Sequence, residues 1–228
     1  LDWPDIWKTF AASTLDTKTA VAVQPPLDDR GFVVGAFKRV FDRGFTLVYS
    51  TGGTEAENAW SFAKARFDAE QWWYRGNGHA KLTSDAEWLK APTDGNVILY
   101  GSADTNRAWP ALIDARIVNI ARDEASAGGR VLHGANLGCL LAIPRKGKTD
   151  SLVGVIGGTG LAGMRATERL GYFSSGVGFP SVVLLRADVW REGFAHFEGG
   201  GKPDAMIWKD ASSETKEAAQ AEPAAPVP

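Results

Sequence analysis

Residues 153–164, VGVIGGTGLAGM, pass from an apolar run through a cluster of glycines into helix-forming residues. This order predicts a buried strand, a tight turn and a helix. The glycines match G-x-G-x-x-G through Gly158, Gly160 and Gly163, and G-x-x-G-x-x-G when Gly157 replaces Gly158. Such glycines let a backbone approach a nucleotide pyrophosphate, or they let a helix pack closely on a strand. We favour the packing interpretation and keep a bound nucleotide as an alternative.

The same pattern occurs in residues 45–74, FTLVYSTGGTEAENAWSFAKARFDAEQWWY. An apolar strand leads through a glycine turn into a helix, and Thr54 with Glu57 forms the capping box that marks a helix start. Four apolar residues recur near one side of this helix, which we expect to be its buried face: Trp60, Ala63, Phe67 and Tyr74.

A further copy lies in residues 97–113, where an apolar strand precedes a helix over 105–113 that Ser102 or Asp104 would cap. Residues 181–185, SVVLL, add another buried strand. These strands are too continuously apolar to have a solvated face, which indicates a parallel sheet covered on both sides.

The predicted fold class is α/β: a three-layer, Rossmann-like domain with a mostly parallel sheet and a small antiparallel insertion. The insertion comes from short strands separated by glycine-rich turns in three stretches: RIVNIAR (116–122), GRVLHG (129–134) and LGCLLAIPRK (137–146).

Three regions are expected along the chain. Residues 1–44 form an irregular lead-in with a short helix near 34–41, and residues 45–200 form the Rossmann-like domain. Residues 201–228, rich in Ala, Glu and Pro, have little to bury and are expected to be a disordered tail.

Composition limits the partners and the metal chemistry. The 228 residues include 25 Lys and Arg against 27 Asp and Glu, a net charge of −2 that favours neither nucleic acid nor an anionic membrane. No apolar segment reaches the roughly 20 residues that span a bilayer. Cys139 is the single cysteine, which excludes an intrachain disulfide. His79, His133 and His196 lie far apart in sequence, so no metal site is expected.

A small ligand, if bound, is expected where parallel strands end, because helix N-termini present free N–H groups there. Three turns should meet at that edge. The candidate ligand-binding residues are those of the three turns: Ser50, Thr51, Gly52, Gly53, Thr54, Ser102, Asp104, Asn106, Gly157, Gly158, Thr159, Gly160 and Gly163.

Two features weigh against nicotinamide chemistry at the glycine turn. The motif usually opens a nucleotide-binding domain, but here it follows more than half of the chain. The short-chain dehydrogenase version, which GGTGLAG resembles most, also needs a downstream Tyr-x-x-x-Lys, whereas Tyr172 is followed by Gly176. Arg186 and Asp188 are the residues that could meet a ribose. We predict no cofactor.

No G-x-S-x-G nucleophile elbow occurs in the chain. Ser50 and Ser174 are the nearest matches, with His196 as the formal base, and turn capping is the simpler role for both hydroxyls. Asp28 and Asp29 follow two prolines and are expected to be solvated. Residues 72–78, WWYRGNG, have a composition that could hold a sugar or a peptide, although helix-end packing is the favoured interpretation.

Five stretches taken in order resemble one family: PPLDDRGFVV, FTLVYSTGGTEAENAWSFAKARFDAEQWWYRGNG, NVILYGSADTNRAW, VGVIGGTGLAGMR and YFSSGVGFP. They are similar to the region that follows the hydrolase domain in large bacterial prolyl-oligopeptidase-like serine hydrolases and esterases. The similarity covers about residues 24–185.

This resemblance implies an accessory α/β domain in a mostly exported family, beside a catalytic module that holds the Ser–Asp–His residues. Because the chain lacks the nucleophile elbow, no catalytic residue carries over. The expected function is a non-catalytic accessory or interaction domain, secreted or periplasmic, whose partner is an α/β-hydrolase catalytic domain in the same or a separate chain. A nucleotide-binding protein and a degenerate serine hydrolase are the alternatives.

Overall fold

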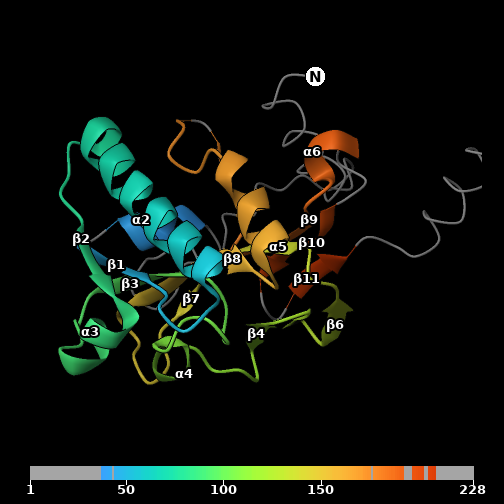
Figure 1. The fold of residues 1–228 in the computed structure, drawn as a ribbon, viewed down its shortest axis with the longest axis horizontal. Helices are drawn as coiled ribbons and strands as arrows, with labels where there is room; N and C mark the ends of the chain where they lie inside the picture. The colour runs from blue at the N-terminus through green and yellow to red at the C-terminus, as the bar shows by residue number, and fades with distance from the viewer. Residues whose placement is uncertain (1–36, 43, 176, 193–196, 203–204, 209–228) are drawn as a thin grey trace, which may run out of the picture.

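The computed structural model describes residues 37–42, 44–175, 177–192, 197–202 and 205–208. They form a main sheet of eight strands and a second sheet of three short strands, with helices packed around them (Figure 1). The predicted α/β class is confirmed.

The main sheet has the strand order β11-β10-β9-β7-β8-β3-β1-β2. Its strands are β1 (Phe45–Tyr49), β2 (Lys81–Ser84), β3 (Asn96–Tyr100), β7 (Leu137–Pro144), β8 (Leu152–Gly158), β9 (Val182–Arg186), β10 (Phe197–Lys202) and β11 (Ala205–Trp208). Neighbours among β2, β1, β3 and β8 are parallel, and the other neighbouring pairs are antiparallel. Only β7 and β10 therefore run against the common direction, so the prediction of a mostly parallel sheet is confirmed.

Strand β7 corrects one prediction, since the stretch LGCLLAIPRK was assigned to the small insertion. It lies instead inside the main sheet, between β8 and β9. Every residue of β7 except Pro144 is buried. Leu140 and Ala142 belong to one core cluster, and Cys139 and Leu141 belong to the other. Both faces of this strand are therefore buried against other side chains.

The small sheet contains β4 (Val118–Ala121), β5 (Glu124–Ala127) and β6 (Arg130–His133), joined as an antiparallel meander. This confirms the predicted antiparallel insertion. The buried residues of β4 and β5 pack with α4 (Trp109–Leu112) in the core cluster below the main sheet. Figure 1 shows α4 and the small sheet on one side of the main sheet, and α2 and α5 on the other.

The opposite face is covered by α2 (Glu55–Gly76), α5 (Leu161–Ala166) and the 3-10 helices η1 (Phe37–Phe41) and η2 (Thr167–Arg169). The lead-in helix was expected over residues 34–41, and its described part is η1. Val40 of η1 lies over Gly154 of β8, where a Cβ atom would be 3.1 Å from its methyl group. A methyl group at position 154 would therefore require Val40 to shift by a few tenths of an ångström.

Helix α2 begins at the predicted capping box, with Thr54 as N-cap and Glu57 as its partner. Its predicted buried face is wrong. Trp60 is buried, but Ala63 is exposed, and Phe67 and Tyr74 are 50% and 78% exposed. The buried face instead carries Trp60 and Ala65 together with four polar residues: Glu57, Ser61, Lys64 and Asp68.

These polar residues are buried because they bind one another and the sheet. Lys64 Nζ lies 2.6 Å from Asp68 Oδ1 and also contacts the hydroxyl of Tyr172. The hydroxyls of Tyr172 and Tyr100 donate to Asp68 Oδ2 at 2.6 and 2.9 Å. This Lys64–Asp68 network holds α2 on the sheet, and it explains why hydrophobic periodicity alone misplaced the buried face.

The helix expected over residues 105–113 is confined to Trp109–Leu112, and neither Ser102 nor Asp104 caps it. The residues before it form a turn, in which the N–H of Asn106 donates to Ser102 O at 2.9 Å. Asn106 Oδ1 then accepts the N–H of Ala108 at 3.1 Å.

Several elements were not predicted: β2, α3 (Asp85–Lys90), β5, η2, α6 (Val189–Glu192), β10 and β11. The start of α3 had a readable signal, since Ser84 and Glu87 form a second capping box. Strands β10 and β11 extend the sheet past residue 200, the expected end of the domain. The pair Asp28–Asp29 and residues 209–228 lie outside the described residues.

We expect alkaline conditions to destabilise the protein through Tyr100 and Tyr172. Burial, with the nearby Asp68 carboxylate, raises the pKa of both hydroxyls well above 10.0. The unfolded chain releases these protons near its ordinary pKa of about 10, so the stabilisation is present below that pH and is lost above it. Each tyrosine should steepen the fall in unfolding free energy by about 1.4 kcal/mol per pH unit. Urea unfolding above about pH 10 should show that the unfolding free energy of Tyr172→Phe falls less steeply with pH than that of the natural chain. An unchanged pH dependence would contradict this.

We expect the Cys139 thiol to be unreactive in the folded protein. Burial raises its pKa to about 12, an effect that outweighs the opposing hydrogen bond from the Gly157 backbone. At pH 8 the thiolate that attacks a disulfide reagent is nearly absent. A thiol assay should detect no fast reaction until urea is added, and then one equivalent. Rapid labelling without urea would show that this part of β7 opens.

Candidate functional site

The three turns predicted to meet at the carboxyl ends of the strands do lie together. The N–H of Gly52, after β1, donates to Thr105 O in the turn after β3 at 2.9 Å. The N–H of Gly101 donates to Ile156 O near the end of β8 at 3.1 Å. The backbone thus joins all three turns directly.

Several polar side chains at this edge are buried and directed into the fold, whereas Thr54 and Asp104 are exposed. Asn106 is fully buried, and its amide donates to Val48 O and Tyr100 O at 3.0 and 3.1 Å, which ties β1 to β3. Ser102 and Thr105 are also buried, and the Ser102 N–H donates to Thr105 Oγ1 at 2.8 Å. These groups use their hydrogen bonds to hold the turns.

Asp85 is a residue of this edge that the sequence analysis missed. It is fully buried at the start of α3. Its carboxylate accepts from Thr51 Oγ1 at 2.5 Å, from the Thr51 N–H at 3.2 Å and from the Arg107 N–H at 2.8 Å. One side chain therefore joins the turns after β1 and β3.

The small sheet closes the edge from outside. The N–H of Asp123 donates to Thr159 O at 2.9 Å, and the Arg122 N–H donates to Asp104 Oδ2 at 2.5 Å. The Arg122 guanidinium pairs with Glu57 through two contacts of 3.0 Å. Burial raises the pKa of Glu57, but the hydrogen bonds from Arg122 and Thr54 more than offset this and lower it. The first turn of α2 thus faces an arginine of the same chain.

The glycines of residues 157–163 lie against backbone atoms. A Cβ on Gly157 would stand 1.7 Å from Gly101 O, and one on Gly163 would stand 2.0 Å from Leu137 O. At Gly158 and Gly160 the nearest atoms are Leu137 O at 2.5 Å and Ala135 O at 2.7 Å. In a dinucleotide fingerprint the second glycine, here Gly160, lacks a side chain so that the pyrophosphate can approach the backbone. In this chain the carbonyl group of Ala135 lies against Gly160 instead.

Thr159, in the same turn, is held by hydrogen bonds to the backbone. Its side chain is buried, and Oγ1 donates to Gly134 O at 2.5 Å and accepts from the Leu137 N–H at 3.2 Å. The hydroxyl is therefore used within the protein.

Neither candidate serine shares a hydrogen bond with a histidine among the described residues. Ser50 is 1% exposed, and its Oγ has no hydrogen-bond partner within the described part of the chain. The N–H of Ser174 donates to Gly171 O at 2.9 Å. His133 lies in β6, 3.8 Å from Glu124, and His196 falls outside the described residues.

Among the residues that the structure describes, no cluster of His, Cys, Asp and Glu could hold a metal ion. Within the same residues, no helix combines the length and the apolar character that crossing a membrane requires.

Comparison with protein-family models, with curated proteins and with solved structures finds no match to this chain.

We expect Gly157→Ala to prevent stable folding, because the new methyl group would overlap the carbonyl of Gly101, whose N–H is bonded to Ile156 O of β8. A loss of more than about 4 kcal/mol is the size seen for the most disruptive single substitutions. Gly178→Ala is the matched control, since nothing lies within 4 Å of its Cβ position. Urea unfolding measures both variants. Equal stabilities would show that this turn can open.

Proposed function

We propose that this chain is a non-catalytic accessory or interaction domain. It acts beside the α/β-hydrolase catalytic domain of a prolyl-oligopeptidase-like serine hydrolase, in the same or a separate chain. The observation that carries the proposal is the closed carboxyl edge of the sheet, where the Gly157–Gly101 contact and the Arg122–Glu57 ion pair occupy the usual position of a ligand.

The order of the motifs supports the hydrolase association. The strands and glycine turns that carry the resemblance are the ones that build the parallel half of the sheet and its carboxyl edge. We infer that the domain is a derivative of the three-layer Rossmann-like arrangement, in which a small antiparallel sheet and short helices replace the long helices of one layer. Export to the periplasm or outside the cell follows from the same resemblance.

Two alternatives have less support. A nucleotide-binding role would need the backbone of Ala135 and Leu137 to leave the glycine turn. A degenerate hydrolase would need either Ser50, which is buried beneath the turn after β3, or the partly exposed Ser174 to reach a substrate and a base.

We expect the purified chain neither to hydrolyse esters nor to bind nucleotides. Hydrolysis of p-nitrophenyl acetate should proceed at the same rate with the natural chain, Ser50→Ala and Ser174→Ala. Titration with NAD, NADP or ATP should leave the tryptophan fluorescence without a saturable change. Turnover lost in either serine variant, or quenching by NAD that Gly160→Arg removes, would overturn the proposal.

The positive test uses the neighbouring coding sequence. We expect it to encode an α/β-hydrolase domain with G-x-S-x-G, and we expect that domain to co-elute with this chain in size-exclusion chromatography when the two are expressed together. Its elution as a separate species, when it is folded and active, would contradict the association.

A further inference from the structure

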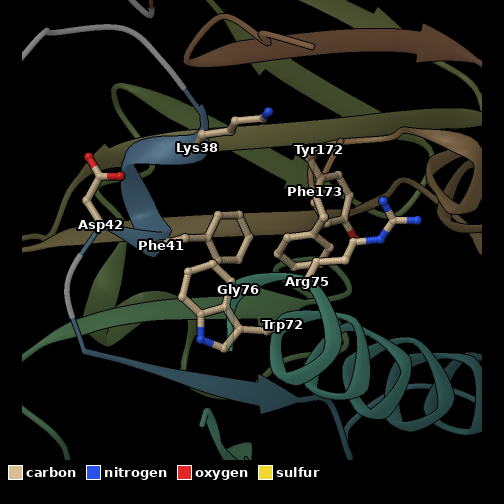
Figure 2. A pocket seen from close by; sticks show the side chains of 8 residues that line it. All are labelled: Lys38, Phe41, Asp42, Trp72, Arg75, Gly76, Tyr172 and Phe173. Carbon is tan, nitrogen blue, oxygen red and sulfur yellow. The ribbon is translucent and has the colours of Figure 1, made fainter. Parts of the chain in front are cut away.

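A pocket of about 210 Å³ opens at the carboxyl end of α2, away from the turns discussed above (Figure 2). Its walls come from η1 and the residue after it, from the last turns of α2, and from the segment after η2. The lining residues are Lys38, Phe41, Asp42, Trp72, Arg75, Gly76, Tyr172 and Phe173.

Four aromatic rings form the apolar part of this pocket. Phe41 stacks on Trp72, with ring centres 5.8 Å apart and planes inclined by 23°. Phe41 and Tyr172 are also stacked, with ring centres 6.1 Å apart and planes inclined by 12°. The ring centre of Phe173 lies 4.9 Å from those of both Phe41 and Tyr172. These mutual contacts fix the rings in place, so a flat ligand would meet a preformed surface.

Tyr172 contributes its ring but not its hydroxyl. The hydroxyl donates to Asp68 and contacts Lys64 in the buried network beneath α2. The polar contacts open to a ligand therefore come from the charged side chains at the rim.

Those charges favour an anion. Lys38 donates to Ser174 O at 2.6 Å, and an ammonium group has two further hydrogens to donate. Arg75 donates from Nε to Gln71 at 2.8 Å, which leaves the two outer nitrogens of its guanidinium for a ligand. The carboxylate of Asp42 is already paired with Arg39 at 2.9 Å, and Figure 2 shows it pointing away from Arg75.

We propose that this pocket binds a small organic carboxylate with a single aromatic ring. The ring lies against Phe41, Trp72 and Phe173, and the carboxylate accepts hydrogen bonds from Lys38 and Arg75. The volume is below that of sites for drug-sized molecules, which limits the ligand to about one ring. Two cations at the rim disfavour the ammonium ligands that aromatic cages otherwise select. This inference stands on the pocket alone and does not depend on a hydrolase partner.

The test is calorimetric titration of the purified full chain with three probes of matched shape: phenylacetate, phenylacetamide and phenethylamine. We expect phenylacetate to bind, and the neutral amide and the amine to bind at least about tenfold more weakly, since charge-assisted hydrogen bonds distinguish them. Equal or tighter binding of the amide or the amine, or no binding of phenylacetate at about 10 mM, would overturn the proposal.

A pair of variants on α2 assigns the site. Arg75→Gln should weaken phenylacetate binding about tenfold. Arg66→Gln is the matched control, because Arg66 is exposed on the same helix and pairs with Glu70. Unchanged binding in Arg75→Gln, or an equal loss in both variants, would rule out this pocket. Because the probe comparison uses the natural chain, it remains decisive if a variant unfolds, and neither result bears on the esterase and co-elution tests.

Discussion

At the carboxyl edge of the sheet, β8 meets the turn after β3 through backbone alone, since a Cβ atom on Gly157 would lie 1.7 Å from Gly101 O. The neighbouring contacts depend on this approach. Cβ atoms on Gly158 and Gly163 would lie 2.5 and 2.0 Å from Leu137 O, so the absence of these side chains lets α5 pack on the start of β7. With the three turns drawn together, the small sheet can cross the edge and bind Thr159 and Glu57. Close backbone packing is thus the constraint that shapes this end of the molecule.

The same constraint separates fold from function here. Glycine turns between strand and helix serve many nucleotide-binding proteins because they leave room for a pyrophosphate. In this chain the room is taken by carbonyl groups of the turn after β3 and of the segment that leads into β7. Polar side chains such as Asn106 and Asp85, which could have faced a ligand, complete the hydrogen bonding of the turns instead. Most of the buried polar groups at this edge are therefore satisfied within the protein, and the Ser50 hydroxyl is the exception among the described turn residues.

The opposite end of the molecule has a different character. The Lys64–Asp68 network holds α2 on the sheet, and it also holds the hydroxyl of Tyr172, a residue that lines the pocket. Breaking a buried ion pair leaves an uncompensated charge, so this network keeps the helix in one position. Trp72 and Arg75, the ring and the cation that α2 contributes to the pocket, are held by that position.

The sequence by itself determined the strands β1, β3, β8 and β9, the start of α2 and the tight turns, because continuous apolar runs, a capping box and glycines are local signals. It also placed the three turns at one edge, through the general rule for parallel strands. Only the tertiary structure decided that β7 lies inside the sheet, that Lys64 and Asp68 rather than Phe67 and Tyr74 face the core, and which atoms meet the glycines. The reason is physical: these outcomes depend on partners such as Tyr172, Gly101 and Leu137, which lie far away along the chain.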